Sequence, residues 1–131
     1  MYKINKEDNN IIKLEQRLFS ELGFRERENL QEWIAKNPDV LGEDLLIIQK
    51  EFDGFNNTNE RLDLLALDKD ANLVIIENKL DDTGKDVVWQ ALKYTSYCST
   101  LTTKEIIKMY QDYLDQYENN EDATTMILDF L

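Results

Sequence analysis

Two acidic residues and a lysine interrupt apolar stretches in the middle of the chain. Glu77 and Lys79 fall inside LVIIENKL (residues 73–80), and Asp63 falls inside RLDLLALD (residues 61–68). Both stretches are typical of buried β-strands, because apolar residues occupy both of their faces. Burying charge costs free energy, so charged residues inside such strands indicate a function.

The two stretches are predicted to form a β-hairpin. The sequence DKDAN separates them and has a normal length for a hairpin loop. Pairing the leucines on either side of this loop places Asp63 opposite Glu77. Opposed residues share one face of a sheet, with Cβ atoms about 5 Å apart. Because side chains alternate along a strand, Lys79 shares that face. We expect these three side chains to converge, with Arg61 next to Lys79.

This arrangement has a specific chemical use. Two opposed carboxylates repel each other, and burial strengthens the repulsion. A divalent cation removes it, and hard oxygen ligands suit Mg²⁺ or Mn²⁺. A lysine beside the metal can steer or deprotonate a water, or stabilise charge developing on a phosphate. The alternative is an ion-pair cluster in which Lys79 and Arg61 neutralise Asp63 and Glu77.

The composition excludes several other kinds of site. The chain of 131 residues has no histidine and one cysteine, Cys98. Catalytic triads that use histidine, His-ligated zinc and sites with several thiolates are therefore excluded. The net charge of −12 opposes non-specific nucleic-acid binding and favours cations. No apolar run approaches the roughly 20 residues of a membrane span, and no secretion signal is present. We expect a cytoplasmic, soluble protein without a membrane partner.

The elements that must position these residues can be predicted from the pattern. Helices are expected over 10–22, 26–37, 87–101 and 103–117, and strands over 45–52, 61–68 and 73–80. Pro38 ends the second helix, and Thr102 with Glu105 forms a capping box. The predicted fold class is an α/β domain with a small mixed central β-sheet flanked by helices. A single domain spans 1–131.

Three stretches taken in order, RLDLLALD, LVIIENKL and WQALKY, resemble the PD-(D/E)xK nuclease superfamily, which has the restriction-endonuclease-like fold. The most similar branch is the NucS-like and tRNA-endonuclease-like one. The chain also resembles the N-terminal module of an uncharacterised bacterial protein family in which a second domain follows. The resemblance covers about residues 26–101, which leaves 102–131 as a C-terminal helical extension. Leu62 stands where the superfamily usually has proline.

The resemblance implies a function and a set of site residues. Asp63 and Glu77 would be metal ligands for Mg²⁺ (or Mn²⁺), and Lys79 the catalytic lysine. The domain would hydrolyse phosphodiester bonds in DNA or, less expected, RNA. A homodimer is common among nucleases that cut two strands. The apolar segment 124–131 would then dock on the core, pair with a second copy or lead into the second domain.

Further residues take auxiliary roles in the same resemblance. In the branch with a QxxxY element, Gln90 and Tyr94 form an auxiliary pair on one face of a helix; the alternative is simple helix packing. The superfamily often adds an acid from the first helix as a metal ligand. Glu28 matches that position best and Glu32 is the alternative, although either also suits a solvated helix surface.

Two rival functions remain open. One is a member of the same fold without catalysis that serves as a protein-interaction or dimerisation module. The other is a nucleic-acid-binding module within a longer chain. The acidic composition departs from the basic face usual in nucleases, so we expect a local positive rim. Its candidates are Lys50, Arg61, Lys79, Lys85 and Lys93.

Overall fold

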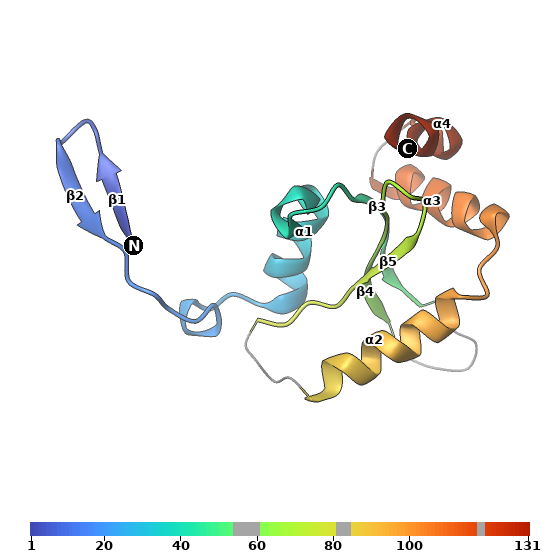
Figure 1. Ribbon diagram of the computed structural model, residues 1–131, viewed down its shortest axis with the longest axis horizontal. Helices are drawn as coiled ribbons and strands as arrows, with labels where there is room; N and C mark the ends of the chain where they lie inside the picture. The colour runs from blue at the N-terminus through green and yellow to red at the C-terminus, as the bar shows by residue number, and fades with distance from the viewer. Residues whose placement is uncertain (54–60, 81–84, 118–119) are drawn as a thin grey trace.

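The structure is a computed structural model that describes residues 1–53, 61–80, 85–117 and 120–131. Its strands are β1 (Tyr2–Asn5), β2 (Asn10–Lys13), β3 (Leu46–Phe52), β4 (Leu62–Leu67) and β5 (Leu73–Ile76). Its α-helices are α1 (Gln31–Lys36), α2 (Lys85–Cys98), α3 (Thr103–Tyr117) and α4 (Ala123–Phe130). In Figure 1 a central sheet lies between α1 and the pair α2 and α3, and the β1–β2 hairpin projects away from this body.

The central sheet has three strands in the order β3-β4-β5, and both pairings are antiparallel. The α/β class is confirmed, and so are the strands expected over 45–52 and 61–68, within a residue at each end. The strand expected over 73–80 ends at Ile76, so Glu77 and Lys79 follow the strand and do not lie inside it. The predicted mixed sheet is not confirmed: no parallel pair occurs among the described strands, because short hairpin connections permit antiparallel pairing alone. β4 is the central strand and its apolar side chains are fully buried. β5 lies at an edge of the described sheet, although the sequence predicts a central strand.

The β4–β5 register agrees with the sequence prediction. Leu67 pairs with Leu73, and the ladder runs on to the pair of Leu64 with Ile76. The next step along each strand reaches Asp63 and Glu77. The hairpin therefore delivers these two carboxyl groups side by side at the point where regular pairing ends.

A β-bulge in β3 changes what lies on the other side of β4. Ile47 pairs with Ala66, but the next pair is Gln49 with Leu65, so Ile48 is an extra residue. The shifted ladder continues until Phe52 pairs with Leu62. One position before that pair, Glu51 lies opposite Asp63. Its backbone is left-handed, with φ of 53°.

The N-terminal segment differs from its prediction. A helix is expected over 10–22, but residues 10–13 form β2, which pairs with β1, and the 3₁₀ helix Ser20–Leu22 follows. The periodic apolar residues have no core to face, because Ile11, Ile12 and their neighbours are exposed. Without such packing a short helix is marginal, and β-branched residues favour a strand.

The helices around the sheet follow their predictions more closely. The helix expected over 26–37 begins with a π-helical turn, Glu26–Leu30, and continues as α1. The helix α3 has the predicted bounds. The carboxylate of Glu105 accepts hydrogen bonds from the main-chain N–H and hydroxyl of Thr102 at 2.7 and 2.6 Å, as expected of a capping box. The apolar end of the chain forms α4, which begins at its cap, Asp122.

The core lies between the sheet and the helices. It is built from β3 and β4, with Tyr94 and Cys98 from α2 and four residues of α3. α4 packs on α3 and adds Ala123, which is fully buried. In the described ranges, no helix combines the length and apolar character needed to cross a membrane.

Candidate active site

The centre of the site is a pair of carboxyl groups where β4 and β5 part. The main-chain N–H of Asn78 donates to Oδ2 of Asp63 at 2.8 Å. The main-chain N–H of Asp63 in turn lies by the Glu77 carboxylate and favours its charged form. These exchanged contacts replace the next rung of the ladder. They fix both carboxyl groups to rigid backbone, which a catalytic or metal site requires.

Glu77 has the most perturbed acidity of this pair. Burial, followed by the negative charge of Asp63, raises the pKa of Glu77 to about 7, and Glu26 adds to this effect. The N–H of Asp63 and the ammonium group of Lys79 lower it by less. Oε1 of Glu77 is buried and accepts no hydrogen bond from the described residues. This one oxygen therefore has no hydrogen-bond donor among the described residues.

The pKa of Asp63 is raised as well. Burial is the main cause, and the charges of Glu26 and Glu51 add to it. The hydrogen bond from Asn78 and the charge of Lys79 oppose it. Lys79 therefore acts on both carboxyl groups, as the predicted convergence of Asp63, Glu77 and Lys79 requires, but it does not neutralise them.

The contacts of Arg61 do not fit the alternative of an ion cluster in which Lys79 and Arg61 neutralise Asp63 and Glu77. Arg61, the second cation proposed for it, directs its guanidinium elsewhere, with Nη1 3.3 Å from Glu51 and Nη2 3.9 Å from Asp53. A pair of acids with raised pKa values beside one lysine is short of positive charge. Such a pair is a candidate for binding a cation or for acid–base chemistry.

The first helical segment contributes an acid, but the one nearest the pair is Glu26. Its Oε1 accepts a hydrogen bond from the main-chain N–H of Leu80 at 3.1 Å, and its charge raises the pKa of both Asp63 and Glu77. Glu28, the predicted ligand, forms an ion pair with Arg25 at 3.0 Å and is 63% exposed.

The alternative first-helix acid, Glu32, is also engaged outside the pair. It forms a 2.8 Å ion pair with Lys50. The π-helical turn explains why spacing missed Glu26: it adds a residue to the turn and so shifts which side chains face the sheet. The role of Glu28 as a ligand stays a prediction, and Glu26 is the acid that the structure brings next to the carboxyl pair.

Gln90 and Tyr94 lie on α2, as predicted. The hydroxyl of Tyr94 donates to the main-chain oxygen of Arg61 at 2.9 Å, and the ring is buried. Tyr94 thereby fixes the backbone two residues before Asp63. Gln90 is half-buried, and its Oε1 finds no partner among the described residues. The buried side-chain amide of Asn78 likewise has no hydrogen-bond partner in the part of the chain that the structure describes. Buried polar groups left unsatisfied often mark places where a water or ion binds.

The donor set suits an oxygen-seeking divalent cation. Asp63 and Glu77 offer carboxylate oxygens, and the unpaired Oε1 of Glu77 is the observation that fits an ion. Across the four described ranges, however, no three acidic, cysteine or histidine side chains gather into a complete ligand set. An ion held here would therefore take further oxygens from water or from a substrate phosphate, as Mg²⁺ commonly does.

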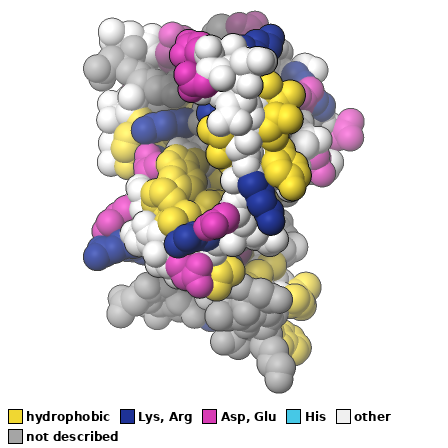
Figure 2. Space-filling model, turned by 90° about the vertical axis from the view of Figure 1, so that its left-hand side faces the viewer, with side chains coloured by type: hydrophobic (Ala, Val, Ile, Leu, Met, Phe, Trp, Pro, Cys, Tyr) yellow, Lys and Arg dark blue, Asp and Glu magenta, His cyan; other side chains and the backbone are white. Residues whose placement is uncertain are grey.

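The predicted positive rim is smaller than expected. Lys50 is 10% exposed, lies 2.8 Å from Glu32 and stacks over the Tyr117 ring, so it does not belong to a rim. The side chain of Lys85 lies outside the described residues. Figure 2, which views the molecule from the side of the N-terminal hairpin, shows Lys and Arg side chains interspersed with Asp and Glu. On this face the described cations do not merge into one basic surface.

One further acid, Glu51, lies beside the site and was not predicted. Its carboxylate is 2.5 Å from Nε of Arg27 and 3.3 Å from Nη1 of Arg61, and it accepts a 3.3 Å hydrogen bond from the side-chain amide of Gln31. The bulge in β3 places it opposite Asp63. The sequence carries no signal for a bulge, so this neighbour could not be inferred from residue spacing.

Comparisons of the chain with protein-family models, with curated proteins and with solved structures give no match.

Proposed function

We propose that this chain is a metal-dependent nuclease domain of the PD-(D/E)xK type, which hydrolyses phosphodiester bonds in nucleic acid. DNA is the expected substrate before RNA. The observation that carries the proposal is the Glu77 carboxyl group, with its pKa of about 7 and an unpaired buried oxygen, beside Asp63 and Lys79. A carboxyl pair short of positive charge, next to a lysine, is what metal-assisted hydrolysis of a phosphodiester requires.

Each residue has a distinct role in this proposal. Asp63 and Glu77 hold the cation, Mg²⁺ or Mn²⁺, which supplies a Lewis acid and lowers the pKa of a bound water. Lys79 offsets negative charge that develops on the phosphate and orients the attacking water. Tyr94 keeps the start of β4 in place through the Arg61 carbonyl. Glu26, rather than the predicted Glu28, is the acid best placed to assist the pair.

A second candidate function is a module with the same fold that binds nucleic acid or another protein without cutting. Two observations favour it: the described residues contain no complete metal-ligand set, and the chain has a net charge of −12. A homodimer and a following domain are compatible with either function and remain proposals.

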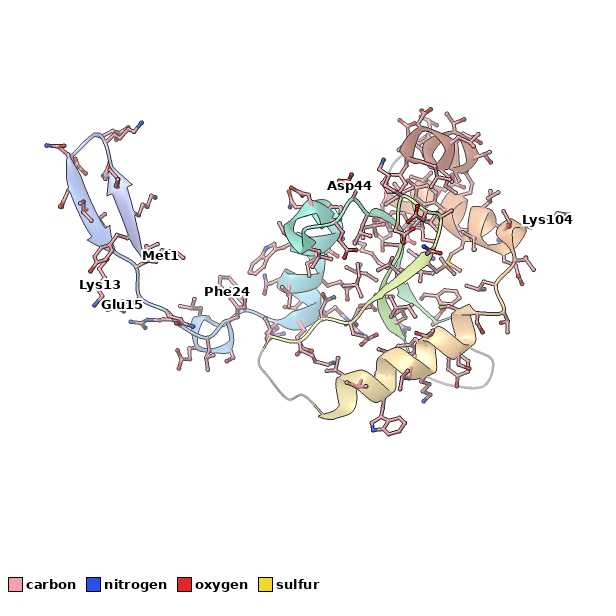
Figure 3. All side chains as sticks on the ribbon, viewed as in Figure 1. Met1, Lys13, Glu15, Phe24, Asp44 and Lys104 are labelled. Atoms are coloured by element: carbon pink, nitrogen blue, oxygen red, sulfur yellow. The ribbon has the colours of Figure 1, made fainter. Side chains whose placement is uncertain are left out.

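The test is cleavage of DNA and RNA with Mg²⁺ or Mn²⁺, together with calorimetry of Mn²⁺ binding. We expect Lys79→Ala to reduce cleavage at least 100-fold and to retain Mn²⁺ binding, since a positioned group contributes about that much. Asp63→Asn should lose both. Lys104→Ala, which changes an exposed lysine in the first turn of α3 (Figure 3), is the matched control and should behave as wild type.

The outcomes separate the two candidates. Cleavage at the wild-type rate by the Lys79→Ala variant would contradict the assignment of Lys79 as the catalytic lysine. A folded wild-type chain that binds no Mn²⁺ and cuts no substrate would instead support the module without catalysis.

A further inference from the structure

The most unusual contacts outside the carboxyl pair surround Glu51. Two guanidinium groups, from Arg27 and Arg61, converge on its two oxygens at 2.5 and 3.3 Å. The Glu51 side chain is 23% exposed, whereas those of Arg27 and Arg61 are 66% and 51% exposed. Nη2 of Arg61 also lies 3.9 Å from Asp53, so the two guanidiniums face two carboxylates and their charges balance. Each guanidinium also has several N–H groups that do not contact Glu51 and can bind a further anion.

Glu51 adopts a backbone conformation that costs free energy. A residue other than glycine with φ of 53° inside a strand costs about 1–3 kcal/mol, and surrounding contacts must maintain it. Here those contacts are the two arginines and the amide of Gln31. Strain of this kind is concentrated at functional sites. The strain indicates that the position of the Glu51 carboxylate has a function beyond stabilising the sheet.

The Glu51 group lies next to the candidate active site. The bulge sets Glu51 opposite Asp63, and the charge of Glu51 raises the pKa of Asp63. Arg61 directly precedes β4, two residues before Asp63, and its main-chain oxygen accepts a hydrogen bond from the Tyr94 hydroxyl. Arg27 comes from the π-helical turn that also contains Glu26. Arg27 thus lies in a helical turn, and Arg61 lies at the start of β4 with its main-chain oxygen bound by Tyr94.

We propose that Arg27 and Arg61, held by Glu51, form a phosphate-binding subsite that takes a backbone phosphate of the nucleic acid next to the one that is cleaved. The inference rests on the proposed function and names how that site binds its substrate. Guanidinium groups match phosphate oxygens in a bidentate geometry. Glu51 is a positioning residue in this subsite, because it directs both arginines without contacting the phosphate.

The test measures binding without cleavage. A fluorescein-labelled single-stranded oligonucleotide is titrated in EDTA, at several salt concentrations, and followed by fluorescence anisotropy. We expect Arg27→Ala and Arg61→Ala each to weaken binding roughly tenfold, because each removes a charge-assisted contact. Each should also lower the slope of log affinity against log salt by about one. The matched control is Arg25→Ala, an exposed arginine of the same segment that pairs with Glu28 instead.

The change in oligonucleotide affinity on substitution of Glu51 tests its role, because the two possible roles predict changes in opposite directions. If Glu51 positions the arginines, Glu51→Gln weakens oligonucleotide binding. If its charge merely repels the substrate, the same variant binds more tightly and the positioning role is overturned. Circular dichroism establishes that each variant is folded. Removal of Arg61 leaves the Glu51 carboxylate with fewer cationic partners, which can destabilise the sheet. The double variant Arg61→Ala with Glu51→Gln removes that charge as well and so separates lost binding from lost stability.

Two further outcomes would decide against the phosphate-binding subsite. Wild-type affinity in Arg27→Ala and Arg61→Ala, or a wild-type chain that binds no oligonucleotide, would overturn the subsite. Because the assay contains neither metal nor cleavage, its failure differs from failure of the proposed function. The latter is read from Lys79→Ala and from Mn²⁺ binding.

Discussion

Among single residues, Glu77 links the stability of the fold most directly to the chemistry of the site. Its carboxyl group is fixed by the end of the hairpin, lies beside Asp63 and has a pKa of about 7 rather than the ordinary 4.5. A folded state that holds a proton more tightly than the unfolded state is stabilised at low pH. The stabilisation is complete below pH 4.5 and is lost as the pH rises to about 7.

The direction of this pH dependence leads to a prediction for Glu77→Gln, which mimics the protonated form of Glu77. At pH 8 and without metal, the variant should be more stable than wild type by about 1–2 kcal/mol, after allowance for solvent screening of a half-exposed group. The difference should shrink as the pH falls from 7 to 4.5. Urea unfolding at several pH values measures it. Glu28→Gln, an exposed acid, should show no such trend. A Glu77→Gln chain less stable than wild type at pH 8 would contradict the assigned burial of charge.

The sequence predicts the central residues of the site and misses their neighbours. Asp63, Glu77 and Lys79 could be found because two strands and a short loop fix their relation. Glu26 and Glu51 could not, because each is placed by an irregularity of the backbone. A π-helical turn shifts Glu26 and a bulge shifts Glu51. Periodicity arguments assume regular turns and ladders, and therefore fail at these two positions.

Among the elements, the β4–β5 hairpin and helix α3 were predictable for the same reason. Their contacts are local: a tight loop sets the register of the hairpin, and the Thr102–Glu105 capping box sets the start of the helix. The helix expected over 10–22 was wrong because its apolar residues had to find a distant surface to pack on. Sequence shows the spacing of apolar residues but not whether a core is there to receive them.

The capping box stabilises the start of α3. Thr102→Ala removes the hydroxyl that donates to Glu105 at 2.6 Å and accepts from its main-chain N–H at 3.3 Å. The free energy of unfolding should fall by about 1 kcal/mol, as is usual for loss of an N-cap. Chemical denaturation measures it. Thr103→Ala, inside the first turn, is the control and should change stability less; equal effects of the two variants would count against the cap.

For the whole molecule, the body and the N-terminal hairpin are distinct in their packing. Met1, Lys13 and Glu15 lie away from the sheet (Figure 3), and most large apolar residues of this segment are exposed. The segment meets the body where Phe19, Phe24 and Trp33 pack edge to face, with ring centroids 5.0–6.1 Å apart. Stability of the body should therefore depend on the aromatic junction and not on the hairpin.

Two truncations test this division. Deletion of residues 1–18 removes the hairpin and should change the free energy of unfolding by less than about 1 kcal/mol, because it removes few buried contacts. Deletion of residues 1–24 also removes Phe19 and Phe24, exposes Trp33 and should cost about 1–3 kcal/mol more. Urea unfolding, followed by circular dichroism, measures both. Equal losses from the two truncations would mean that the hairpin packs on the body.

The extra residue in β3 decides which charge lies opposite Asp63 in the sheet. Continued without a bulge, the pairing of Leu46 with Leu67 would bring Lys50, not Glu51, opposite Asp63. An ammonium group would then sit where a carboxylate now lies, and Asp63 would be neutralised within the sheet. The bulge therefore decides whether Asp63 faces a carboxylate or an ammonium group across the sheet.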